Sequence, residues 1–183
     1  MEEKELTRAI LVSADTGAYD CDVSMDELAE LARTAGAQEV ARVIQKRDAY
    51  ESATVIGEGK LEEVKELCVS LEAKLLIFDI ELTASQIRNI EEATDVRVID
   101  RTMLILDIFA LNARTGEGKL QVELAQLKYT APRLIGKGAQ LSRLGGGIGT
   151  RGPGESKLET DRRHMQRRIH ALEAQIAEMD KNR

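Results

Sequence analysis

A glycine-rich segment flanked by arginines holds the residues of this sequence that are best suited to bind a ligand. Residues 136–154 contain 8 of the 14 glycines. Glycine lets the backbone approach a ligand closely, and its exposed amides bind phosphate oxygens, as guanidinium groups do. Such contacts recognise the shape and backbone of folded RNA without aromatic stacking. The predicted RNA-binding residues are Lys137, Ser142, Arg143, Gly145, Gly146, Gly147, Gly149, Thr150, Arg151, Gly152, Arg162 and Arg163.

Two other interpretations of this segment exist. Gly147, Gly149 and Gly152 have the spacing of a dinucleotide-binding fingerprint, but that fingerprint follows a strand and opens a helix. A helical heptad pattern precedes the glycines here, and Pro153 follows them, which disfavours dinucleotide binding. The other alternative is a plain flexible connection between two helices. Such connections usually have about 2–8 residues, and a longer loop in a basic context is more often functional.

The remaining candidates for chemistry do not form a complete catalytic, cofactor-binding or metal-binding set. Residues 57–60 read Gly-Glu-Gly-Lys, but Leu follows the lysine where a phosphate-binding loop has Ser or Thr. His164 and His170 are too far apart in sequence to share one helical face as a ligand pair. Cys21 and Cys68 have no nearby histidine and are expected to be structural. We therefore expect no catalytic, cofactor-binding or metal-binding residue in this chain.

Charge divides the chain into two parts. Residues 1–113 carry 12 Lys/Arg and 24 Asp/Glu, whereas residues 114–183 carry 14 and 8. An acidic body with a basic extension favours a polyanionic partner at one end, although solvated helix faces would give a similar count. Aromatic residues make up only 3% and there is no Trp, which disfavours a base-stacking platform. Two distant cysteines, no apolar run long enough for a membrane span and no signal peptide predict a cytoplasmic protein.

The elements of the first part alternate between strands and helices. Strands are predicted at 9–12, 40–44, 53–56, 75–78 and 96–99. Capping boxes that begin at Ser24 and Thr83 predict two helix starts, and residues 61–68 have apolar residues at helical spacing. This alternation is typical of βαβ units. We expect an α/β subdomain over residues 1–100, with a small, mainly parallel sheet flanked by helices.

The second part, residues 101–183, is predicted to be helical. Asp100 is expected to cap a helix that includes residues 103–110, and heptad-like seams follow at 120–134 and 158–179. Two such seams joined by the glycine-rich tip, residues 136–155, predict a long antiparallel two-helix hairpin of the coiled-coil type. Pro132 is expected to kink or interrupt the first arm, and a capping box at Ser156 to begin the second. We expect a monomer.

Several segments resemble the HflX-type GTPases. They are residues 100–102, 105–110, 117–127, 141–155, 157–159 and 161–163, together with 56–61, which resemble the family's segment near the second strand. The resemblance covers essentially the whole chain. It implies the N-terminal domain and helical hairpin of a ribosome-associated GTPase, in a chain that ends before the GTPase domain.

The resemblance also implies a function and partners. The family binds the large ribosomal subunit and splits or rescues stalled ribosomes, and the tip matched by residues 145–154 reaches ribosomal RNA near the peptidyl transferase centre. Expected partners are that subunit, through its RNA, and the protein's own C-terminal GTPase domain. GTP and magnesium are implied for the full-length protein, with no cofactor in this part. Two alternatives remain open: an ATP-binding or ATPase module that uses residues 57–60 and the sheet edge, and a purely regulatory scaffold for the GTPase domain.

Overall fold

The computed structural model describes residues 5–133 and 157–183, with side chains from residue 161 onward in the second range. Contacts divide the chain into two compact units, Met1–Ile108 and Phe109–Arg183. We refer to them as the body and the helical unit. The division falls after the residue 100 boundary expected from the sequence. The reason is that Leu104 and Ile108, which follow that boundary, are themselves buried.

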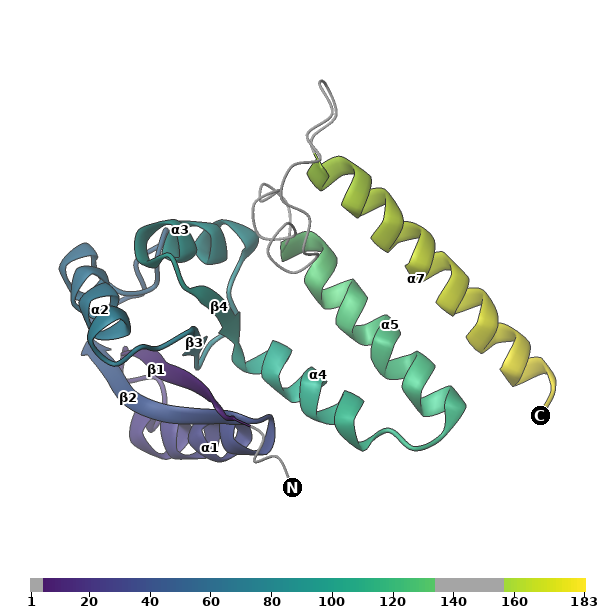
Figure 1. The fold of residues 1–183 in the computed structure, drawn as a ribbon, viewed down its shortest axis with the longest axis horizontal. Coiled ribbons are helices and arrows are strands. Elements are labelled where there is room, and N and C mark those ends of the chain that lie inside the picture. The colour runs from purple at the N-terminus through teal and green to yellow at the C-terminus, as the bar shows by residue number, and fades with distance from the viewer. Residues whose placement is uncertain (1–4, 134–156) are drawn as a thin grey trace. The chain divides into compact units, whose positions relative to one another are not determined.

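The body contains a four-stranded parallel sheet (Figure 1). Its strands are β1 (Thr7–Asp15), β2 (Ala37–Lys46), β3 (Leu75–Phe78) and β4 (Arg97–Asp100), in the order β2-β1-β3-β4. The chain leaves β1 toward β2 and leaves β3 toward β4. The carboxyl ends of β1 and β3 therefore form the switch point at which open parallel sheets typically bind ligands.

Helices cover both faces of this sheet because the strands are apolar on both sides. Alternate residues of β1 belong to different cores: Ile10 and Val12 pack with α2 (Glu58–Ser70) and α3 (Ala84–Thr94). Ala9 and Leu11 pack with α1 (Cys21–Thr34) and with the start of α4 (Arg101–Asn112). The predicted α/β class, with a small parallel sheet flanked by helices, is confirmed.

Cap residues explain most helix starts. Thr83 and Gln86 form the predicted capping box of α3, and the Asp100 carboxylate accepts a hydrogen bond from the Met103 amide at 2.9 Å, as a cap of α4 does. The prediction for α1 was wrong. Its cap is Asp20, whose side chain accepts from the Val23 amide, so the helix begins before Ser24. An aspartate cap and a serine box are equally good signals in sequence, and tertiary packing of Cys21 and Met25 decides between them.

The strand predicted at residues 53–56 is also absent. This segment is part of the connection from β2 to α2, closed by an isolated bridge in which Glu51 and Val55 exchange two backbone hydrogen bonds of 2.9 and 2.8 Å. Val55 has a left-handed backbone with φ of 68°, which no strand residue adopts. Val55 and Ile56 are nevertheless fully buried in the core. Their apolar character therefore indicated burial, and we mistook it for strand pairing.

The helical unit contains α5 (Gly116–Arg133) and α7 (Lys157–Lys181), which pack along each other in antiparallel fashion (Figure 1). Arg183, just beyond the end of α7, pairs with Glu117 at the start of α5. Ile169 and Leu172 of α7 are buried. The helix α5 includes Pro132 and is described as far as Arg133, so the kink or interruption expected at Pro132 stays a prediction. The predicted tip and the capping box at Ser156 lie outside them, and no helix that the structure describes could cross a membrane.

Candidate functional site

The half of α7 that follows the glycine-rich segment is basic. Arg162, Arg163 and Arg167 are exposed there, and Arg162 and Arg163 are two of the twelve predicted RNA-binding residues. The other ten, from Lys137 to Gly152, lie outside the described residues. The basic half can present guanidinium groups to a phosphate backbone.

Helix periodicity separates these arginines into two groups. Arg163 and Arg167 are one turn apart and lie on the side of α7 opposite Ile169 and Leu172, which makes them an outward-facing pair. Arg168 instead joins the two helices. Its Nε and Nη2 donate to the two carboxylate oxygens of Glu123 at 2.7 and 2.9 Å. This hydrogen bonding raises the pKa of Arg168 and lowers the pKa of Glu123.

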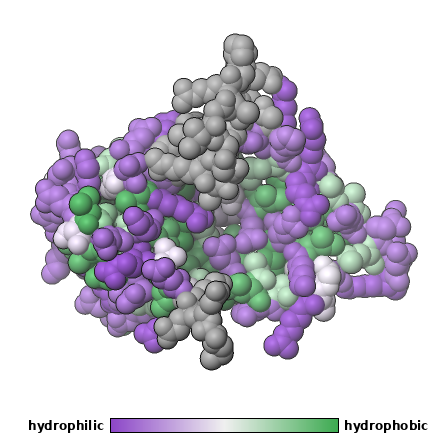
Figure 2. Space-filling model, in the orientation of Figure 1, coloured by the Kyte–Doolittle hydropathy of each residue, from purple (hydrophilic) through white to green (hydrophobic). Residues whose placement is uncertain are grey.

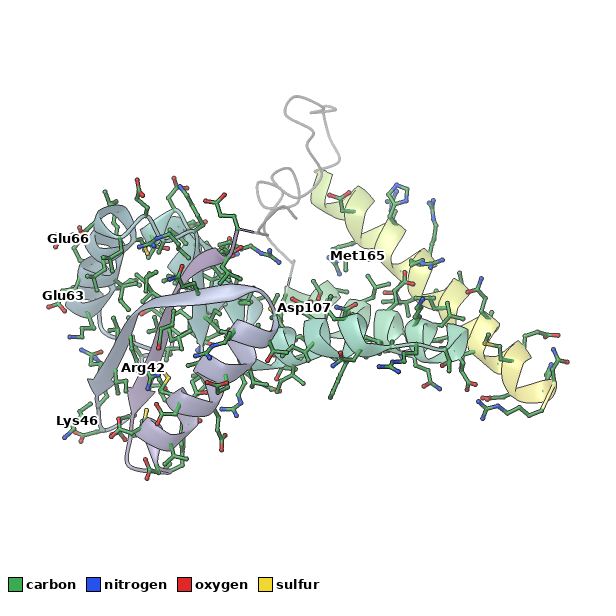
Figure 3. All side chains as sticks on the ribbon, turned by 60° about the horizontal axis from the view of Figure 1, so that its bottom comes forward. Arg42, Lys46, Glu63, Glu66, Asp107 and Met165 are labelled. Carbon is green, nitrogen blue, oxygen red and sulfur yellow. The ribbon has the colours of Figure 1, made fainter. Side chains whose placement is uncertain are left out.

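The last described turn of α5 adds a cation that the sequence analysis missed. The guanidinium of Arg133 lies 3.4 Å from the centre of the Tyr129 ring and donates to the Tyr129 carbonyl at 2.8 Å. A basic residue four positions after a tyrosine on one helix face was the available signal. Figure 3 shows α5 and α7 with their side chains, including Met165 on α7.

A second polar centre lies at the carboxyl edge of the sheet, near the switch point. The buried carboxylate of Asp79 follows β3, and Arg101 at the start of α4 donates to it at 2.8 Å. Arg101 also donates to the Ser24 hydroxyl at 2.9 Å and to the Glu27 carboxylate at 2.9 Å. This guanidinium therefore ties α1 and the end of β3 to the start of α4. Asp79 directly follows the strand predicted at residues 75–78, but nothing in the sequence indicated Arg101 as its partner.

Burial and neighbouring charge shift the acid–base behaviour of this edge. Burial raises the pKa of Tyr19 to about 12, helped by the charge of Asp79, while Ser13 acts in the opposite direction. Burial also raises the pKa of the Cys21 and Cys68 thiols. Raised thiol pKa values disfavour the reactive thiolate, which agrees with structural cysteines.

The residues of the body do not fit a nucleoside triphosphate with its metal. Gly57 caps α2, and its amide donates to the Gln45 side chain at 2.8 Å, so it does not point freely into a phosphate cradle. The Lys60 ammonium pairs with Glu63 at 3.0 Å. At the sheet edge Arg101 is bound by Asp79 and Glu27, and Arg47 is bound by Glu51, so both guanidinium groups already have carboxylate partners in place of a polyphosphate. Within the described ranges no group of three or more His, Cys, Asp or Glu side chains could hold a metal ion.

Comparison with known proteins assigns most of the chain to two regions of one family. Residues 22–110 match the family described as the N-terminal region of GTP-binding GTPases. Residues 112–183 match the middle region of the same GTPases. The border between the two matches lies close to the border between the body and the helical unit.

Individual relatives agree with that assignment. A GTPase HflX of Caldanaerobacter subterraneus subsp. tengcongensis is 54% identical over 185 residues, which cover 100% of this chain and 43% of that protein. The GTPase HflX of Escherichia coli K12 is 45% identical, over 88% of this chain and 39% of that protein. The chain therefore spans less than half the length of these curated relatives.

Solved structures support the fold. A GTP-binding protein from Sulfolobus solfataricus in complex with GDP superposes with a TM-score of 0.64 at 23% identity, covering 96% of this chain and 46% of that one. A complex of the protein called SsGBP with GDP superposes with a TM-score of 0.67 at 24% identity, covering 96% and 44%.

Proposed function

Since the chain belongs to the HflX family of GTPases, whose N-terminal and middle regions it matches, we propose that it forms the ribosome-binding part of such a GTPase. In this proposal the helical unit contacts ribosomal RNA of the large subunit. The observation that carries the proposal is the outward-facing pair Arg163 and Arg167 in the half of α7 next to the glycine-rich segment.

The charge pattern supports this assignment. Residues 157–170 of α7 contain five Lys/Arg and two Asp/Glu, whereas residues 171–183 contain two and three. The body is acidic, and Figure 2 shows many hydrophilic side chains on it, with apolar patches between them. Phosphates attract residues 157–170 and repel the acidic body. Residues 157–170 would therefore face the nucleic acid when RNA is bound. The predicted contacts from Lys137 to Gly152 would extend the same surface.

Nucleotide chemistry belongs to another part of such a GTPase in this proposal. Members of the family are GTPases, which implies GTP and magnesium for the full-length protein. The described residues do not fit either group, so we assign GTP binding to the region of the relatives that this chain does not match. Splitting or rescue of stalled ribosomes in the cytoplasm would then combine RNA contact by this chain with GTP hydrolysis by the region that this chain does not match.

Co-sedimentation with purified large ribosomal subunits across a salt series tests the proposal. We expect binding that weakens steeply with salt, because each phosphate contact releases counterions. The variant Arg163→Ala/Arg167→Ala should bind more weakly, and its salt slope should fall by about one for each phosphate contact that is lost. The matched control is Arg33→Ala/Lys65→Ala, which removes the same charge from exposed helix positions of the body. An equal loss in both variants would contradict the proposal.

The alternatives raised by the sequence make different predictions in simple experiments. A purely regulatory scaffold would leave the chain unable to co-sediment with large subunits at any salt concentration. An ATP-binding module would release or absorb heat when ATP is titrated into the chain in a calorimeter. Salt-dependent sedimentation without heat from ATP is the result that we expect.

A further inference from the structure

Two of the three tyrosines in the chain lie in neighbouring connections at the carboxyl edge of the sheet, which the Arg47 amide joins by a hydrogen bond of 3.0 Å to the Asp15 carbonyl. Tyr19 lies in the connection from β1 to α1, and Tyr50 lies in the connection from β2 to α2. They are 40% and 39% exposed. Tyr50 is close enough to raise the pKa of Tyr19 electrostatically. Exposed aromatic side chains are scarce in this chain, so finding two at one edge points to a contact surface.

The same two connections enclose an open hollow of about 420 Å³. Residues 15–17 line it from the β1 side, and residues 46–48 line it from the β2 side. Figure 3 shows Lys46 at the end of β2. We call the hollow together with Tyr19 and Tyr50 the tyrosine edge. It combines a concave surface with two exposed rings, and it lies at the end of the sheet where parallel folds bind their partners.

The two connections that form the tyrosine edge, residues 15–22 and 46–51, carry five Asp/Glu and two Lys/Arg, so their charge is predominantly negative although Lys46 is exposed. Its arginines are already paired: Arg47 donates to the Ala49 carbonyl at 3.1 Å and to Glu51 at 3.4 Å, and the nearby Arg101 is held by Asp79 and Glu27. The exposed carboxylates of Asp22 and Asp48 form no ion pair with any residue that the structure describes. The edge therefore offers unpaired carboxylates to a cationic partner.

We propose that the tyrosine edge is a docking surface for an arginine-rich segment of another protein. Guanidinium groups stack on tyrosine rings and bind carboxylates in bidentate fashion, and Tyr19, Tyr50, Asp22 and Asp48 supply both kinds of group. A nucleic acid does not fit, because the unpaired carboxylates would repel its phosphates. The tyrosine edge belongs to the body and uses no residue of α7, so it does not depend on the function proposed above.

Fluorescence anisotropy with a short labelled peptide in which arginine and glycine alternate tests this inference on the intact chain. We expect saturable binding at about 0.1 M salt, where long-range attraction is screened. Because the chain has no Trp, a change in tyrosine fluorescence should accompany binding. The matched peptide with lysine in place of arginine should bind several-fold more weakly, because arginine stacks better on aromatic rings.

Two pairs of variants locate the contact. Tyr19→Ala/Tyr50→Ala should weaken binding about tenfold, whereas Tyr129→Ala in the helical unit should not change it. Asp22→Asn/Asp48→Asn keeps every ring and should also weaken binding, whereas Glu62→Gln/Glu66→Gln, the same charge change on exposed positions of α2, should not. The asparagine variants keep the inference testable if the tyrosine variants fail to fold.

Three results would overturn the inference. The peptide could fail to bind at about 0.1 M salt. The two charge variants could weaken binding equally, which would mean attraction to the acidic body as a whole. A single-stranded RNA oligomer could compete with the peptide and bind more weakly to the tyrosine variants, which would make the edge a nucleic-acid surface instead.

Discussion

Different interactions stabilise the body and the helical unit internally. The body buries apolar side chains on both faces of its sheet, and Phe78, Leu28 and Leu76 are among those with no exposed surface. In the described part of the helical unit, only Ile169 and Leu172 are buried, and the other contacts along the seam are half-exposed. Ion pairs such as Arg168–Glu123 and Lys128–Glu173 join α5 to α7.

This difference in stabilisation predicts that the body is more rigid than the helical unit. Burial stabilises the body at about 25 cal/mol for each Å² of apolar surface removed from water. Exposed ion pairs add little, and isolated helices are marginal in water. The body is therefore the rigid scaffold, and the helical unit is the part whose structure depends on a thin seam. Four substitutions test this difference between the two units, and they are given in order of decreasing expected effect.

The largest effect is expected from the core of the body. Phe78→Ala removes a fully buried ring from the core between the sheet and the helices α2 and α3. It should lower the free energy of unfolding by about 4 kcal/mol, because the cavity cannot collapse in a packed sheet. Urea unfolding followed by circular dichroism measures it. The control Phe109→Ala, at a ring that is 55% exposed, should change stability by less than about 0.5 kcal/mol.

The second-largest effect is expected from the contact between α5 and α7 in the helical unit. Leu172→Ala removes the one side chain without exposed surface among residues 161–181 of α7, and we expect a loss of about 3 kcal/mol from the pairing of α5 with α7. The rate of amide hydrogen exchange should increase in these two helices and stay unchanged in β1 and β3. Met179→Ala, at the exposed end of the same helix, is the control. Faster exchange throughout the body would show that the two units unfold together, contrary to the comparison.

A smaller loss of stability is expected when a buried helix cap in the body is removed. Asp100 accepts hydrogen bonds from the amides of Leu82 at 3.0 Å and Met103 at 2.9 Å. Asp100→Ala leaves both donors without this acceptor and should cost about 2 kcal/mol. Thermal unfolding measures the change, with the exposed Asp48→Ala as control. A loss no larger than that of the control would mean that water replaces the carboxylate.

The smallest effect is expected from the exposed pair between the helices. Because Arg168 lowers the pKa of Glu123, the pair stabilises the helical unit at neutral pH and loses its contribution as the pH falls through that lowered pKa. Arg168→Gln should return the pKa of Glu123 toward its ordinary value. Nuclear magnetic resonance titration of the Glu123 carboxyl carbon measures this shift. An unchanged pKa in the variant would assign the shift to another cause.

The residue pattern alone predicted much of the fold. Four of the five predicted strands, the Thr83 capping box and the Asp100 cap are present, because these signals act over a few neighbouring residues. The strand predicted at 53–56 failed because Val55 is buried by contacts that are distant in sequence. Of the predicted RNA-binding residues, the structure describes Arg162 and Arg163 and places both on the exposed surface of α7.

The sequence by itself determined the alternation of strands and helices, the helical seams and the opposite charges of the two parts, since periodicity and composition are local properties. Only the tertiary structure decided that Arg168 of α7 binds Glu123 of α5. It alone also joined Arg101 to Asp79 and placed Tyr19 and Tyr50 in connections that lie side by side. These pairs come from separate elements, and parallel strands with crossover helices bring such elements to one edge of the sheet regardless of their distance along the chain.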